Sequence, residues 1–128
     1  MVKVFAPGSI GNVGPGFDVL GLAVEGIGDI VTMEESSETS IEIFGRGAEI
    51  IPTDPKLNTV SIAAKALMDR YKVSKNISIK IDRSLPSSGG LGASAASSVA
   101  GALAAAAIIE TAVEQADIIE AALVAETA

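Results

Sequence analysis

The sequence predicts an α+β fold in which helices cover one face of a mostly antiparallel sheet. Strand-like segments fill much of the first 45 residues and recur near residue 80, whereas helical spacing dominates residues 59–71 and nearly everything after residue 93. The composition agrees with this, because 128 residues with 48% hydrophobic and 20% charged side chains can build the core of one domain. We therefore treat residues 1–128 as one domain.

The first part of the chain is predicted to be mainly strands. Val2–Phe5 starts as a strand, and Ala6-Pro7-Gly8 is expected to break it into a glycine-rich loop. Strand-like segments follow at 21–24, 29–34 and 40–44, the last with isoleucine alternating with glutamate. Three such segments in succession predict a meander.

A helix and a strand are predicted next. Asn58 or Thr59 can cap a helix whose apolar residues keep helical spacing to about Tyr71. From Ile77 to Ile81, isoleucines then alternate with polar residues, which is typical of a half-buried strand.

Two further helices are predicted, over residues 93–109 and from residue 113 onward. The second pattern reaches the last residue without a glycine, asparagine or proline stop signal. We therefore expect the domain to be truncated, as the amino-terminal part of a longer protein.

The charge balance disfavours nucleic acid as a partner. The formal net charge is −7, whereas binding to a phosphate backbone needs clustered lysine and arginine. No basic residue follows Arg83, so an anion bound in the second half must be held by backbone N–H groups, a helix dipole or a metal ion. The chain also has no cysteine and no histidine, which excludes disulfides and imidazole bases and fits a cytoplasmic protein.

No membrane segment and no targeting signal are expected. The chain starts directly with strand-like residues rather than with a basic and then apolar leader. Leu85–Ile109 is uncharged, but its first half is rich in serine and glycine and its second half in alanine, a composition that favours a buried helix.

A glycine- and serine-rich segment joins the strand that ends near residue 83 to the helix predicted from residue 93. Glycine lets the backbone curl so that N–H groups point at an anion, and the helix start adds its positive dipole end. Ser94 falls in the first helical turn, where its hydroxyl can reach a phosphate or Mg²⁺. Neither the Walker pattern nor a dinucleotide fingerprint occurs in this segment. The alternative is a turn whose small residues only permit close helix packing.

The run from Pro86 to Ala95 resembles the phosphate-binding motif of the galactokinase, homoserine kinase, mevalonate kinase and phosphomevalonate kinase (GHMP) superfamily. In that motif a proline and three variable residues precede Gly-Leu-Gly-Ser-Ser-Ala. The resemblance implies a two-layer α/β sandwich of the ribosomal-protein-like type, and a Mg²⁺ contact at Ser94. Ala93 replaces the first family serine and cannot supply that hydroxyl. The ATP-binding residues implied are Pro86, Ser88, Gly89, Gly90, Leu91, Gly92, Ala93, Ser94 and Ala95.

A second segment, residues 6–23, resembles the opening of homoserine kinases. It contains Asn12 and Asp18 on either side of a Gly-Pro-Gly turn, an amide and a carboxylate that can converge on an amino acid. From the residues alone, a simple turn with Asp18 as a helix cap is favoured. The resemblance implies homoserine contacts at Asn12 and Asp18, and an adenine contact at Asn58, which a helix cap explains equally well.

Glu126 is predicted to lie on the apolar side of the last helix. It follows Ile119 by seven residues, Ala122 by four and Leu123 by three. Burying a carboxylate at this position costs free energy unless the charge is paired. A bound metal ion would pair it, and fraying of the final turn would instead leave it in water. Homoserine kinases have a Mg²⁺-binding glutamate on the corresponding helix, so the resemblance implies that Glu126 contacts the metal together with Ser94.

The resemblance implies transfer of the ATP γ-phosphate to the homoserine hydroxyl, a step of threonine biosynthesis, with ATP and Mg²⁺ as cofactors. No residue is assigned as a catalytic base. The 128-residue chain alone is expected to be inactive, because the family's substrate-binding arginines and third glycine motif lie beyond it. Two alternatives remain open: a catalytically incomplete nucleotide-binding module, and self-association, as in a homodimer, through the alanine-rich helices.

Overall fold

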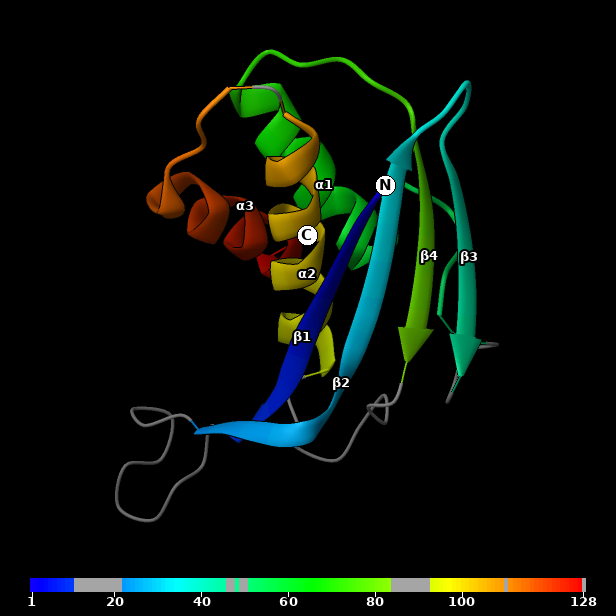
Figure 1. Cartoon of the computed structure of the whole chain (residues 1–128), viewed down its shortest axis with the longest axis vertical. Helices are drawn as coiled ribbons and strands as arrows, with labels where there is room; N and C mark the ends of the chain where they lie inside the picture. The colour runs from blue at the N-terminus through cyan, green and yellow to red at the C-terminus, as the bar shows by residue number, and fades with distance from the viewer. Residues whose placement is uncertain (11–21, 46–47, 49–50, 84–92, 110, 128) are drawn as a thin grey trace.

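The computed structural model describes residues 1–10, 22–45, 48, 51–83, 93–109 and 111–127. It confirms the α+β prediction: a four-stranded sheet carries the helices on one face (Figure 1). In chain order the elements are β1 (Val2–Ile10), β2 (Leu22–Glu35), β3 (Ser40–Gly45), α1 (Thr59–Arg70), β4 (Ile77–Arg83), α2 (Ala93–Ile108) and α3 (Gln115–Thr127).

The first two strands are longer than predicted. β1 continues through Pro7 to Ile10 with an irregularity in register between Pro7 and Ser9, so the predicted break at Ala6-Pro7-Gly8 is wrong. Proline is tolerated because β1 is an edge strand of the described sheet, where a missing N–H need not interrupt a ladder on both sides. Residues 22–24 and 29–34, which were predicted as parts of two separate strands, likewise belong to one strand, β2.

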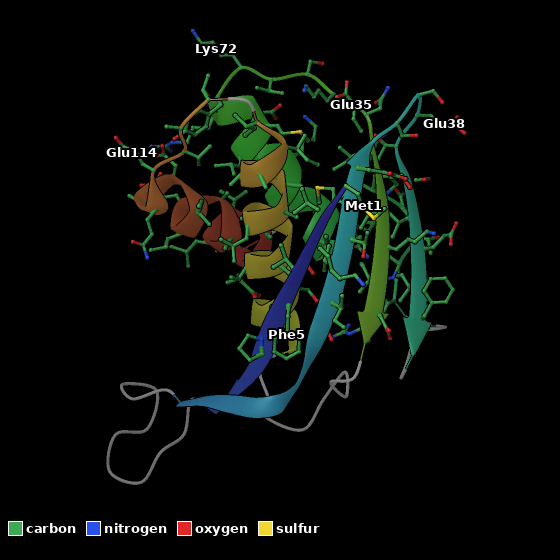
Figure 2. All side chains as sticks on the ribbon, in the orientation of Figure 1. Met1, Phe5, Glu35, Glu38, Lys72 and Glu114 are labelled. Carbon is green, nitrogen blue, oxygen red and sulfur yellow. The ribbon has the colours of Figure 1, made fainter. Side chains whose placement is uncertain are left out.

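Gly28 allows β1 and β2 to run this close together. A Cβ at residue 28 would lie 2.4 Å from the carbonyl oxygen of Ala6 and would also meet the ring of Phe5. Phe5 extends from β1 and remains half exposed (Figure 2). This glycine within β2 is therefore a point of close backbone approach.

The predicted meander is also wrong, because β4 is inserted between β2 and β3. The sheet order is β1-β2-β4-β3, with β4 antiparallel to β2 and parallel to β3. Parallel neighbours need a crossover connection, and α1 provides it between β3 and β4. The central position suits β4, whose isoleucines Ile77, Ile79 and Ile81 are all buried.

Side chains from both layers fill the space between the helices and the sheet (Figure 2). Val31, Met33 and Ile79 from the sheet and Leu67 from α1 are fully buried. Helix α2 contributes mainly alanines and approaches α1 so closely that a Cβ on Gly101 would lie 2.3 Å from the Val60 carbonyl oxygen. No helix in the described part of the chain is both long enough and apolar enough to cross a membrane.

Helix α3 buries its small residues and exposes its large ones. Ala121, Ala122 and Ala125 are buried, whereas Ile119 and Leu123 are more than half exposed. The close approach of helices through alanine accounts for this choice. The apolar side predicted from Ile119 and Leu123 is therefore not the face that packs.

Candidate functional site

The candidate site lies where β4 ends and α2 begins. β4 stops at Arg83 and α2 starts at Ala93, as the sequence predicts, so the glycine-rich motif connects a central strand to a helix start. Ala93, Ser94 and Ala95 form the first turn of α2. Eight predicted site residues lie outside the described residues: Asn12, Asp18, Pro86, Ser88, Gly89, Gly90, Leu91 and Gly92.

Glu126 on α3 faces α2 near this helix start. The Ser98 hydroxyl donates to Oε1 of Glu126 over 3.3 Å, and position 98 lies one turn after position 94 on the same side of α2. Glu126 itself is exposed rather than embedded in apolar surroundings, so the prediction that it lies on the apolar side is wrong. Its orientation toward α2 nevertheless places a carboxylate beside Ser98, in the second turn of that helix.

Asn58 caps α1, as one of the two sequence interpretations predicts. Its Oδ1 accepts hydrogen bonds from the N–H groups of Val60 (3.0 Å) and Ser61 (3.4 Å), while Nδ2 donates to the Pro52 carbonyl oxygen (2.9 Å). The residue is only 2% exposed. Both ends of the carboxamide therefore have structural partners, and the adenine contact stays a prediction.

A buried polar cluster next to the site was missed from the sequence. Asp29 on β2 lies 3.3 Å from Arg83 at the end of β4, measured from Oδ2 to Nε, and the Ser97 hydroxyl donates to the same Oδ2 over 3.2 Å. A signal was present: Arg83 continues the alternation of Ile77, Ile79 and Ile81, which places it on the buried face. An arginine at such a position needs a buried anion, and Asp29 is the partner.

The chain can now be compared with known proteins. Residues 58–128 match the family model described as the GHMP kinases N terminal domain, which is more than half of the chain. The chain belongs to the GHMP kinase family. The resemblance inferred from residues 86–95 is thereby confirmed.

Several curated relatives of this GHMP kinase chain are homoserine kinases. The homoserine kinase of Halorubrum lacusprofundi is 44% identical over 104 residues, covering 81% of this chain and 33% of the relative. That of Pyrococcus furiosus is 43% identical over 108 residues, 84% of this chain and 36% of the relative. The chain therefore spans about a third of the length of the curated relatives it matches.

Solved structures agree on the fold. A homoserine kinase from Cytophaga hutchinsonii superposes with a TM-score of 0.87 at 36% identity, over 98% of this chain and 40% of the other. The mevalonate kinase of Methanococcus jannaschii superposes with a TM-score of 0.75 at 17% identity, over 98% and 46% respectively, which supports the fold alone.

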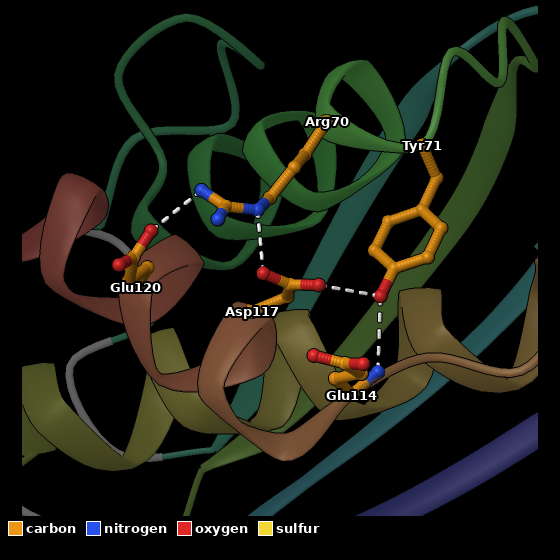
Figure 3. A network of polar contacts seen from close by, with 5 residues as sticks. All are labelled: Arg70, Tyr71, Glu114, Asp117 and Glu120. Carbon is orange, nitrogen blue, oxygen red and sulfur yellow. Dashed lines mark hydrogen bonds and ion pairs between the residues drawn. The ribbon is translucent and has the colours of Figure 1, made fainter.

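A second polar network fixes the far end of the helix layer of this GHMP kinase chain. The Asp117 carboxylate on α3 lies 2.6 Å from Nε of Arg70, and the Tyr71 hydroxyl donates to its other oxygen over 2.6 Å (Figure 3). The Tyr71 oxygen in turn accepts from the Glu114 N–H. The attraction of Asp117 raises the pKa of Arg70, and its hydrogen bond raises the pKa of Tyr71. This network joins the carboxyl end of α1 to the start of α3.

A groove of about 620 Å³ lies beside α1, with Ile77 at the start of β4 in its wall. It is therefore at the opposite end of β4 from Arg83. Two of its three lysines have carboxylate partners, since Lys65 pairs with Asp69 at 2.9 Å and Lys75 with Glu35 at 3.3 Å. The groove lies away from the glycine motif, which remains the candidate phosphate site.

Proposed function

We propose that the chain is the ATP-binding part of a homoserine kinase, which transfers the γ-phosphate of ATP to the homoserine hydroxyl in threonine biosynthesis. The observation that carries the proposal is the position of the motif at residues 86–95, between the end of β4 and the first turn of α2. Identities of 42–44% to homoserine kinases over about 100 residues favour this substrate within the family.

The phosphates would be held without a lysine. Backbone N–H groups of residues 87–92 and the amino end of α2 supply partial positive charge, which suits a segment followed by no basic residue. We assign ATP contacts to residues 86 and 88–95. Asn58 is assigned to the adenine, for which Nδ2 carries a second hydrogen besides the one donated to Pro52.

The residues present fit a Mg²⁺ ion. Magnesium prefers oxygen ligands and is commonly bound by one or two carboxylates together with substrate phosphates. Glu126 offers an exposed carboxylate turned toward α2, and Ser94 offers a hydroxyl one turn before Ser98, the donor that orients Glu126. When bound, Mg²⁺ neutralises charge on the transferred phosphoryl group. In the described part of the chain no cluster of three or more acidic, histidine or cysteine ligands occurs. Substrate phosphates and water, which Mg²⁺ commonly keeps as ligands, would supplement Ser94 and Glu126.

Asn12 and Asp18 are assigned to homoserine, with Asp18 accepting from the ammonium group. The chain is assigned no general base, so its contribution to catalysis is alignment of ATP with the hydroxyl and electrostatic stabilisation. We place the protein in the cytoplasm, with which the absence of cysteine agrees.

The test is a phosphotransfer assay on the protein expressed from its full reading frame, with Mg·ATP and homoserine, mevalonate or galactose as acceptors. We expect phosphorylated homoserine and little product from the other two. Preferential phosphorylation of mevalonate or galactose would overturn the substrate assignment. Binding of Mg·ATP without transfer to any of them would favour the nucleotide-binding module instead.

A further inference from the structure

The buried face of the sheet ends in two charged residues, Asp29 and Arg83, beside the candidate site. On β2 the buried, helix-facing positions are Asp29, Val31 and Met33, and on β4 the same stripe of isoleucines ends at Arg83. Asp29 and Arg83 are direct partners in the antiparallel register. Asp29 is fully buried, and the Arg83 side chain is 8% exposed.

One carboxylate oxygen connects the two elements that flank the glycine motif. Oδ2 of Asp29 lies 3.3 Å from Nε of Arg83, the last residue of β4, and accepts from Ser97 in the second turn of α2 over 3.2 Å. Ser97 is itself buried. The carboxylate therefore stands between the strand end and the helix start and contacts both.

The geometry of this ion pair is poor for a stabilising contact. Arginine usually binds a carboxylate through two parallel hydrogen bonds, but Nε and Nη2 of Arg83 are buried without a hydrogen-bond acceptor among the described residues. Replacing a buried ion pair by apolar residues of similar volume is often neutral or stabilising. Stability alone therefore does not explain an aspartate and an arginine at this position.

We propose that Asp29 is a positioning residue for the phosphate-binding motif: through Arg83 and Ser97 it fixes the separation between the end of β4 and the start of α2. The expected effect on nucleotide affinity rests on the proposed function. A misplacement of about 1 Å in a binding or catalytic group can lower reaction rates a hundredfold. A change in the separation between the end of β4 and the start of α2 should therefore weaken nucleotide binding measurably.

The test replaces the pair by apolar residues, in the variant Asp29→Leu/Arg83→Met. We expect a melting temperature equal to or above that of the wild type, and a Kd for Mg·ATP raised about tenfold or more. The matched control neutralises the exposed pair as Lys65→Gln/Asp69→Asn and should leave the Kd unchanged. A folded double variant with wild-type affinity would overturn the proposal.

If the double variant does not fold, Ser97→Ala removes one connection and leaves the ion pair intact. It should raise the Kd severalfold without lowering the melting temperature by more than a few degrees, and an unchanged Kd would count against the proposal.

Hydrogen exchange gives a readout that needs no nucleotide. In the double variant, or in Ser97→Ala, amides of residues 93–101 should exchange severalfold faster while those of α1 keep their wild-type rates. Equal rates in α2 would overturn the positioning role. If the wild type fails to bind Mg·ATP, the proposed function fails, and this exchange measurement still decides the role of Asp29.

Discussion

Replacing Gly101 by alanine should destabilise the fold, although alanine is the better helix former. On an exposed helix surface this substitution gains about 1 kcal/mol. Here the new Cβ would lie 2.3 Å from the carbonyl oxygen of Val60 and 2.9 Å from its Cα. Both neighbours are backbone atoms of α1, so relief requires movement of a helix rather than of a side chain. Overpacking of a core costs about 1–3 kcal/mol, and the upper end applies to a backbone clash. The expected net loss is about 2 kcal/mol.

Equilibrium unfolding in urea, followed by circular dichroism, measures this loss. The matched control is Ala107→Gly at an exposed position of the same helix, which should lose about 1 kcal/mol through helix propensity alone. If Gly101→Ala is as stable as the wild type or more stable, α1 and α2 do not approach as described.

Three further predictions concern single contacts. The chain has one tyrosine and no tryptophan, so tyrosinate absorbance reports Tyr71 alone; its titration midpoint should lie above that of free tyrosine and should fall in Asp117→Asn. Because the pKa of Tyr71 is raised in the folded state, the stability contributed by this contact is complete below the unfolded pKa of about 10 and is lost as the pH rises through the folded pKa. A free energy of unfolding that does not change over this alkaline range would contradict the contact. Asn58→Ala should lower the free energy of unfolding by about 1 kcal/mol. Asn58→Asp keeps the capping oxygen but turns its other oxygen toward the Pro52 carbonyl, so it should not restore the full stability of the wild type. Glu126→Gln should weaken ATP binding in the presence of Mg²⁺ but not in its absence, and Ser98→Ala should do so to a smaller degree. An equal loss of affinity in both conditions would contradict the assignment of Glu126 as a metal ligand.

The sequence predicted the elements that depend on local patterns. The alternation from Ile77 to Ile81, the Asn58 cap and the helix start at Ala93 are each encoded within a few neighbouring residues, and the structure has all three. The motif at residues 86–95 identified the family for a similar reason, since its spacing is contained in ten residues.

Features that depend on distant pairing were predicted less well. Whether β3 lies beside β2 or beside β4 depends on which strand takes the position between two neighbours, and no local pattern reports that choice. Pro7 was expected to end its strand because the edge position of that strand in the sheet was unknown. The pairing of Asp29 with Arg83 joins residues more than 50 positions apart.

The outward face of α3 was predicted wrongly for an energetic reason. Large apolar residues such as Ile119 and Leu123 are expected to be buried first, but the close approach of the helices selects alanine at the contact. The orientation of Glu126 toward Ser98 follows from that packing.

The central claim is that the glycine motif and the first turn of α2 bind the phosphates of Mg·ATP through Ser94. Calorimetric titration of the chain with ATP, with and without Mg²⁺, tests it most directly, using the wild type and Ser94→Ala. We predict binding that depends on Mg²⁺ and becomes about tenfold or more weaker in Ser94→Ala, the loss typical of a charge-assisted contact. An absence of binding by the folded wild type, or equal affinity in the variant, would contradict the account.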